Sequence, residues 1–151
     1  MKLRHFITSI IIASFFIFTS CKFNHEAKLV ILHTNDTHSH IYPDPECDLG
    51  GALRRKVLID SVRACEKNVL LVDAGDAVQG SLYYTCYKGL VEALMMNGLE
   101  YDIVTIGNHE FDNAMQSLAN QYKALNASIV SANYDLSNTP LDTMVTPIAI
   151  K

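Results

Sequence analysis

Three short clusters of polar residues in this chain have the composition of a metal-binding site. They are Asn35-Asp36-Thr37-His38, Asp73-Ala74-Gly75-Asp76 and Asn108-His109-Glu110-Phe111-Asp112. Each cluster offers carboxylate or amide oxygens, and the first and third also offer imidazole nitrogens. A mixed set of oxygen and nitrogen ligands suits Mn²⁺, Zn²⁺ or Fe, whereas Ca²⁺ prefers an all-oxygen cage. The clusters therefore indicate metal-assisted chemistry.

The spacing of these residues fits two divalent metal ions. Asp36 and His38, one residue apart, can reach the same ion from a turn. Asp76 has two carboxylate oxygens and can bridge two ions, and Asn108 offers a neutral oxygen to the second. Two ions roughly 3.5–4 Å apart can hold a phosphate and lower the pKa of a bound water, which then attacks phosphorus in line.

The third cluster also contains a candidate catalytic pair. With Asn108 assigned to the metal, the imidazole of His109 is free to contact the phosphoryl oxygens. Asp112 follows three residues later and can orient that imidazole and hold its charge, because a catalytic imidazole usually needs such a partner. We therefore predict that His109 and Asp112 act together.

Neighbouring polar residues are expected to have supporting roles. Asp73 lies at the end of a strand and is predicted to hold the following loop through hydrogen bonds rather than to bind metal. Glu110 is predicted to support the metal ligands rather than to bind the metal itself, and His40 is predicted to lie outside the site.

Apolar runs and helix-like segments alternate along the chain. Runs typical of strands span 28–33, 69–72, 103–106, 128–131 and 145–150, and helices are predicted at 51–66, at 84–97 with Gly98 closing it, and from about Asn113. Repeated β-α-β units predict an α/β fold with a largely parallel sheet. Since each polar cluster directly follows a strand, all three should meet at the carboxyl edge of that sheet.

Helical spacing also predicts which side chains are buried. On 51–66 the predicted core side is Val57, Leu58, Val62 and Cys65, and on 84–97 it is Tyr84, Tyr87, Val91 and Leu94. Cys65 and Cys86 are then packed thiols, and His33 is a hydrogen-bonded core residue of the first strand. None of Cys47, Cys65 and Cys86 has the spacing of a zinc site, and the sequence leaves any disulfide between them open.

The first 21 residues are typical of an export signal. Lys2 and Arg4 precede a nearly continuous apolar run from Phe6 to Phe18, and small residues precede Cys21. Phe-Thr-Ser-Cys resembles a bacterial lipobox, so we expect lipid attachment at Cys21, a polar tether at 22–27 and a location in the cell envelope, as a periplasmic or outer-membrane lipoprotein. The alternatives are an ordinary cleaved signal and an uncleaved anchor.

The charge balance gives no indication of nucleic-acid binding. Without Lys2 and Arg4, 10 of the 12 basic residues remain against 16 acidic residues, a net charge of −6 for the exported part. Nucleic-acid-binding domains usually show a basic stripe or patch, and this sequence has none.

The three clusters together resemble the motifs of the calcineurin-like metallophosphoesterases. The stretches HTNDTHSH and GNHEFDN, with Gln79-Gly80-Ser81 after Asp76, are most similar to those of the exported 5'-nucleotidases. The resemblance covers residues 28–151 and implies a partial β-sandwich flanked by helices. It also implies Asp36 and His38 on one metal ion, Asp76 bridging, Asn108 on the second ion, and a His109–Asp112 catalytic dyad.

This sequence departs from the family's pattern in one respect. Family members have further histidines that complete both metal shells, and often a separate C-terminal domain that stacks the nucleotide base, whereas no histidine follows His109 here. We therefore expect an N-terminal part of a catalytic domain, from a truncated gene product or a longer frame. It should have an exposed sheet edge and be inactive toward AMP without the downstream segment.

Several functions stay open at this point. The expected substrate is a nucleoside monophosphate, and the alternatives within the family are 2',3'-cyclic nucleotides, UDP-sugars and other phosphate esters. Outside enzymes, the alternatives are a surface lipoprotein that binds nucleotides or metal without turnover and a remnant without function.

Overall fold

The computed structural model describes residues 27–151. The predictions for the signal at 1–21, for Cys21 and for most of the tether lie outside these residues. Within them, no helix is long and apolar enough to cross a membrane.

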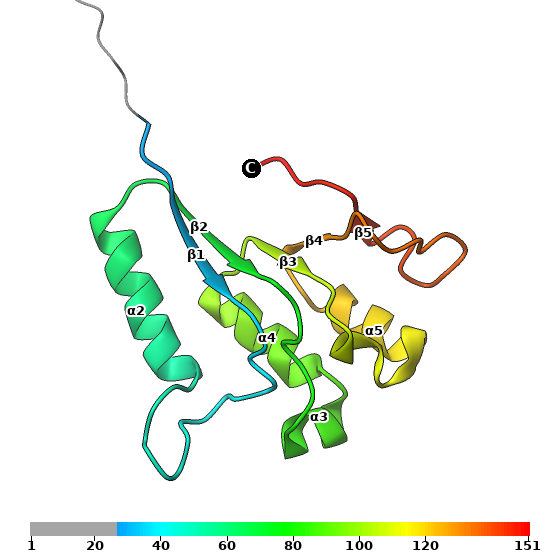
Figure 1. The fold of residues 1–151 in the computed structure, drawn as a ribbon, viewed down its shortest axis with the longest axis horizontal. Coiled ribbons are helices and arrows are strands. Elements are labelled where there is room, and N and C mark those ends of the chain that lie inside the picture. The colour runs from blue at the N-terminus through cyan, green and yellow to red at the C-terminus, as the bar shows by residue number, and fades with distance from the viewer. Residues whose placement is uncertain (1–26) are drawn as a thin grey trace, which may run out of the picture.

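The described chain forms one sheet of five parallel strands, arranged in the order in which they occur (Figure 1). The strands are β1 (Val30–Thr34), β2 (Val69–Asp73), β3 (Ile103–Thr105), β4 (Ser128–Val130) and β5 (Val145–Thr146). The helices are α2 (Ala52–Cys65), α3 (Leu82–Tyr87), α4 (Leu90–Leu99) and α5 (Ala114–Lys123), with a 3-10 helix η1 (His109–Phe111). The predicted α/β fold with a parallel sheet is confirmed.

The helices α2, α4 and α5 lie side by side against the sheet (Figure 1). Crossovers between parallel strands are almost always right-handed, so strands added in chain order place their helices on the same face. The core forms between this helix layer and the sheet, where Ile59, Leu71, Val104, Leu118 and Ile129 are buried. The sheet therefore has one covered face.

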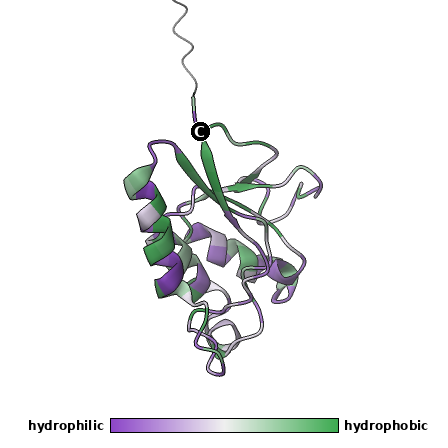
Figure 2. Cartoon of the chain, turned by 60° about the vertical axis from the view of Figure 1, so that its left-hand side comes forward, coloured by the Kyte–Doolittle hydropathy of each residue, from purple (hydrophilic) through white to green (hydrophobic). Residues whose placement is uncertain are grey.

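The opposite face of the sheet is open among the described residues. Leu29 and Ile31, beside and on β1, are 59% and 56% exposed. Figure 2 shows β1 and β2 as hydrophobic strands. Parallel sheets usually bury both faces, so their strands are hydrophobic on both sides. Where the sequence predicts an exposed sheet edge, the structure shows that an apolar face is exposed as well.

The helix predicted at 84–97 is in fact two helices. Lys88 and Gly89 between α3 and α4 have left-handed φ values of 55° and 92°. A Cβ on Gly89 would lie 2.1 Å from Oε1 of Gln121, and the φ of Gly89 is one that residues other than glycine rarely adopt. The predicted closure at Gly98 is also wrong, because α4 continues to Leu99 and Glu100 adopts the left-handed cap.

The break changes which helix face is buried. Tyr84 is buried as predicted, but Tyr87 and Leu94 are exposed. The buried side of α4 consists of Glu92, Ala93, Met96 and Leu99. The turn between the helices rotates α4 relative to α3, so a single helical periodicity does not extend through both.

The predicted core side of α2 is wrong as well. Val57 and Leu58 are exposed, whereas Ile59 is 2% exposed and packs in the core. α2 lies at the end of the helix row (Figure 1), and Ile59 is the one buried residue of this helix.

The predicted packed thiols are not found. Cys47, Cys65 and Cys86 are all free and exposed. His33 is exposed too, because it shares the open face of β1 with Ile31 rather than the covered face.

Candidate metal centre

The loops that follow β1 and β2 run side by side at the carboxyl edge of the sheet. Three backbone hydrogen bonds join them: Asp36 N–H to Gly75 O at 3.0 Å, His38 N–H to Asp76 O at 3.1 Å, and Ser39 N–H to Ala77 O at 3.0 Å. The first two predicted clusters are therefore held together by the backbone itself.

The loop that follows β3 packs against the same site. A Cβ on Gly75 would lie 2.6 Å from the Gly107 nitrogen, and a Cβ on Gly107 would lie 2.1 Å from Oδ1 of Asp76. The backbone N–H of His109 donates to that Asp76 oxygen at 2.9 Å. Because Gly75 and Gly107 have no side chains, the second and third clusters can contact each other directly.

Three side chains converge where these loops meet. His38, Asp76 and His109 each offer a ligand atom, and these atoms lie within 4.8 Å of one another. The rings of His38 and His109 stand edge to face with centroids 5.2 Å apart. Oδ1 of Asp36 lies 3.7 Å from Nε2 of His38. Of the predicted ligands, His38 and Asp76 therefore lie in the cluster, and Asp36 lies beside His38. The third member of the cluster is His109, which the sequence assigns to catalysis rather than to metal binding.

The donor set fits a divalent metal ion. Nδ1 of His38 is buried and has no hydrogen-bond partner among the described residues. A buried polar atom without a partner costs free energy, and coordination to a metal would offset that cost. Imidazole nitrogens with carboxylate oxygens are ligands that Mn²⁺, Zn²⁺ and Fe accept.

The backbone at the three predicted ligands is strained. Asp36, His38 and Asp76 have φ values of 50°, 42° and 54°. Residues other than glycine are uncommon in this left-handed region, which costs about 1–3 kcal/mol for each, and such residues concentrate at functional sites. The loop-to-loop hydrogen bonds hold this conformation.

His109 and Asp112 form the predicted pair. Nδ1 of His109 lies 2.8 Å from Oδ2 of Asp112. This hydrogen bond raises the pKa of His109, because the carboxylate stabilises the imidazolium, and Asp76 adds to the shift through its charge. Asn108 lies directly before His109 and is exposed at the N-cap position of η1.

The two acidic residues with predicted supporting roles are buried beneath the site. Asp73 accepts from the Thr34 hydroxyl at 2.6 Å and from the Gly75 N–H at 3.0 Å, which confirms its predicted role in holding the loop. Burial raises the pKa of Asp73 and also that of Glu110, because desolvation disfavours their charged forms. His40 is exposed and lies outside the cluster.

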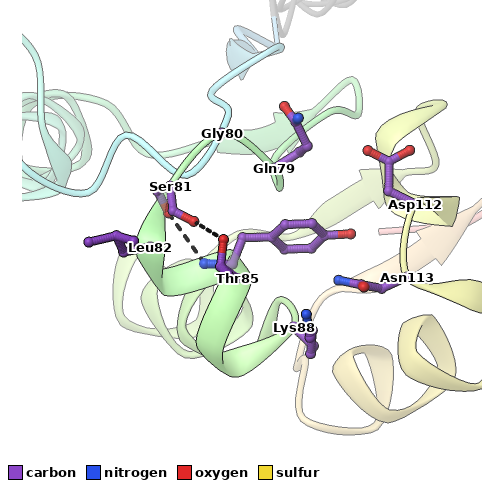
Figure 3. A pocket seen from close by; sticks show the side chains of 9 residues that line it. Gln79, Gly80, Ser81, Leu82, Thr85, Lys88, Asp112 and Asn113 are labelled. Carbon is purple, nitrogen blue, oxygen red and sulfur yellow. Dashed lines mark hydrogen bonds between the residues drawn. The ribbon is translucent and has the colours of Figure 1, made fainter.

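An open cavity of about 540 Å³ lies beside the dyad. Figure 3 shows Asp112 and Asn113 on one side of it, with Gln79 and Lys88 among the other lining residues. The hydroxyl of Tyr84, also in the lining, lies 3.5 Å from the carbonyl oxygen of His109. Helical spacing predicts Tyr84 only as a core residue, because it does not show what a buried hydroxyl contacts.

The fold and the cluster agree with a known family. Residues 29–146 match the family model described as calcineurin-like phosphoesterase, and the chain belongs to this family of phosphoester hydrolases. The resemblance predicted from the three clusters is confirmed.

Relatives of this chain include named nucleotidases. It is 41% identical over 116 residues to 5'-nucleotidase of Bos taurus, an alignment that covers 70% of this chain and 20% of the relative. It is 41% identical over 127 residues to the trifunctional nucleotide phosphoesterase protein YfkN of Bacillus subtilis, covering 74% and 8%. The crystal structure of the 5'-nucleotidase precursor from Thermus thermophilus matches with a TM-score of 0.75 and 41% identity, covering 80% of this chain and 25% of that one. The chain thus spans a quarter or less of each of these relatives.

Proposed function

We propose that this chain forms the first part of the catalytic domain of a two-metal phosphoester hydrolase that acts on nucleoside 5'-monophosphates. The observation that supports this proposal is the meeting of His38, Asp76 and His109 at one sheet edge. Asp36 lies beside His38, and Asp112 lies beside His109. The similarity to proteins named 5'-nucleotidase supports the class of substrate.

In this proposal, the metal ligands are those predicted from the sequence. Asp36 and His38 would hold one ion, Asp76 would be shared with the second, and Asn108 would supply an oxygen to the second ion. When bound, Mn²⁺, Zn²⁺ or Fe would polarise the phosphate and lower the pKa of a water molecule.

The proposed dyad acts on the phosphate through one imidazole nitrogen. Asp112 occupies Nδ1 of His109 at 2.8 Å, so Nε2 is the nitrogen left for a phosphoryl oxygen. Since Asp112 raises the pKa of His109, the imidazole keeps its proton to higher pH and donates it in a hydrogen bond to the charge that develops there.

We also propose that residues 1–151 alone do not turn over AMP. Asp36, His38, Asp76 and Asn108, with one of them shared, leave most coordination positions of two ions to water. Phosphoryl transfer of this kind depends on two well-placed ions as well as on the imidazole.

A chimera tests both proposals. Residues 22–146 would be joined to the rest of the catalytic segment of the Thermus thermophilus relative and assayed with Mn²⁺ or Zn²⁺ on AMP, 2',3'-cyclic AMP and UDP-glucose. We expect the chimera to release phosphate from AMP, the same chimera with Asp76→Asn to be inactive, and the isolated chain to be inactive. Turnover by the isolated chain near the median enzyme value of about 10 s⁻¹ would contradict the second proposal. A folded chimera inactive on all three substrates would contradict the first.

For localisation, we propose that Cys21 is the lipid-bearing first residue of an exported envelope protein. Cells fed an alkyne fatty acid should label the wild-type chain and the control Cys47→Ser, and Cys21→Ser should lose the label. Label that persists in Cys21→Ser would rule out this anchor.

A further inference from the structure

Glu110 lies in the middle of η1 and is 4% exposed. Its carboxylate accepts three backbone hydrogen bonds. Oε2 accepts from the N–H of Asp76 at 3.0 Å and from the N–H of Gly107 at 2.7 Å, and Oε1 accepts from the N–H of Ala77 at 3.0 Å. Both oxygens of the carboxylate are therefore used.

These three donors belong to two different loops. Asp76 and Ala77 follow β2, whereas Gly107 and Glu110 itself follow β3. The loops touch directly at Gly75 and Gly107, where a Cβ on either residue would overlap the other loop. One buried side chain thus joins the loop of the proposed bridging ligand to the loop of Asn108 and His109.

The contacts of Asp76 show what this junction fixes. Its N–H donates to Glu110, and its Oδ1 accepts from the N–H of His109 at 2.9 Å. Its left-handed backbone, with φ of 54°, is a conformation that persists only when surrounding contacts enforce it. Glu110 supplies one of these contacts at the backbone atom itself.

We infer that Glu110 is the positioning residue of the metal centre, which holds the Asp76 loop against the Asn108–His109 loop and so fixes the separation of the ligands for the two ions. The consequence for metal binding rests on the proposed function, whereas the junction between the two loops does not.

Substitution of Glu110 by glutamine tests the junction. Glu110→Gln keeps the shape of the side chain but replaces one accepting oxygen by an NH₂ group, which cannot accept from a backbone N–H. In the full, metal-free chain purified in detergent, we expect the amides of Asp76, Ala77 and Gly107 to exchange with solvent faster, as measured by NMR. The amide of Gly75 is the internal reference, because it donates to Asp73 instead, at 3.0 Å.

Titration with Mn²⁺ tests the consequence for the metal centre. We expect Glu110→Gln to bind Mn²⁺ about 10–100-fold more weakly, the usual effect of losing a group that orients metal ligands. Glu92→Gln is the matched control, since Glu92 is 0% exposed and its carboxylate has no hydrogen-bond partner among the described residues. It should bind Mn²⁺ as wild type does.

A second variant separates positioning from folding. Gly107→Ala keeps Glu110 but places a methyl group against Asp76, so it should weaken Mn²⁺ binding in the same way. Gly98→Ala is its control, because a Cβ there meets nothing within 4 Å. If Glu110→Gln fails to fold, judged by circular dichroism, the Mn²⁺ affinity of Gly107→Ala tests instead whether the close approach of the two loops fixes the metal ligands.

The outcomes distinguish this inference from the proposed function. Wild-type amide exchange and wild-type Mn²⁺ affinity in Glu110→Gln would overturn the inference, as would wild-type affinity in a folded Gly107→Ala. If the wild-type chain itself binds no Mn²⁺, the titration is repeated with the chimeric catalytic domain, and the proposed metal centre fails if that domain binds none either. Amide exchange then still decides whether Glu110 joins the two loops.

Discussion

Asp76 and Asn108 differ sharply in how the chain holds them. Asp76 is fixed at its backbone N–H by Glu110 and at its side chain by the N–H of His109. Asn108 is exposed at the start of η1. A ligand held in place loses less freedom when it binds a metal ion, so Asp76 should contribute more to metal affinity.

Substitution at these two positions should have unequal effects on metal content. In the chimeric catalytic domain, Asp76→Asn should lose both ions, because in the proposed site its carboxylate would serve both. Asn108→Ala should retain the ion held by Asp36 and His38. Metal analysis after dialysis measures this difference, and two tightly bound ions in Asp76→Asn would show that the bridging assignment is wrong.

The His109–Asp112 contact predicts a pH effect in the metal-free chain. Asp112 raises the pKa of His109, so the pair adds stability that is fully present below the ordinary histidine pKa. This stability is lost as the pH rises through the raised pKa. An NMR titration should show the His109 pKa fall in Asp112→Asn. Asp60→Asn, which removes the same charge from α2, is the control, and an unchanged His109 titration in Asp112→Asn would contradict the dyad.

At the scale of the elements, two glycines of the same region have opposite roles. Gly89 joins α3 to α4 with φ of 92° and lies against the buried side chain of Gln121. Gly98 lies inside α4, and a Cβ there would meet nothing within 4 Å. The first position requires glycine, and the second does not.

Alanine at these two glycines should therefore change stability in opposite directions. Gly89→Ala should lower the free energy of unfolding by about 1–3 kcal/mol, the cost of a left-handed residue other than glycine. Gly98→Ala should raise it by about 0.5–1 kcal/mol, because alanine favours helix interiors. Urea denaturation measures both, and equal effects would mean that α3 and α4 are one helix in solution.

In the whole molecule, the open face of the sheet leaves apolar side chains uncovered by the other described residues. Leu29 and Ile31 are more than half exposed, whereas the helix layer buries Leu71 and Val104 on the other face. Exposed apolar side chains on one face favour association with another surface.

Charged residues on this face should make the chain more soluble without unfolding it. Leu29→Lys with Ile31→Lys should reduce binding of the dye ANS, and the free energy of unfolding should change by less than about 0.5 kcal/mol per substitution, because both side chains are already exposed. Leu53→Lys on α2, where Leu53 is 83% exposed, is the control outside this face. Dye binding that stays at the wild-type level would show that the face is covered in solution.

The strands, their parallel arrangement and the three polar clusters at the sheet edge were all predictable from the amino-acid sequence. These features are encoded locally, since an apolar run followed by a polar loop identifies both a strand and its carboxyl end. The buried sides of α2 and α4, as Val57 and Ile59 show for α2, and the positions that require glycine emerged only from the folded chain. The same is true of the contacts of Glu110, which binds amides 33 and 34 residues earlier in the chain. These properties arise from contacts between segments far apart in the sequence, and the local pattern of side chains does not specify such contacts.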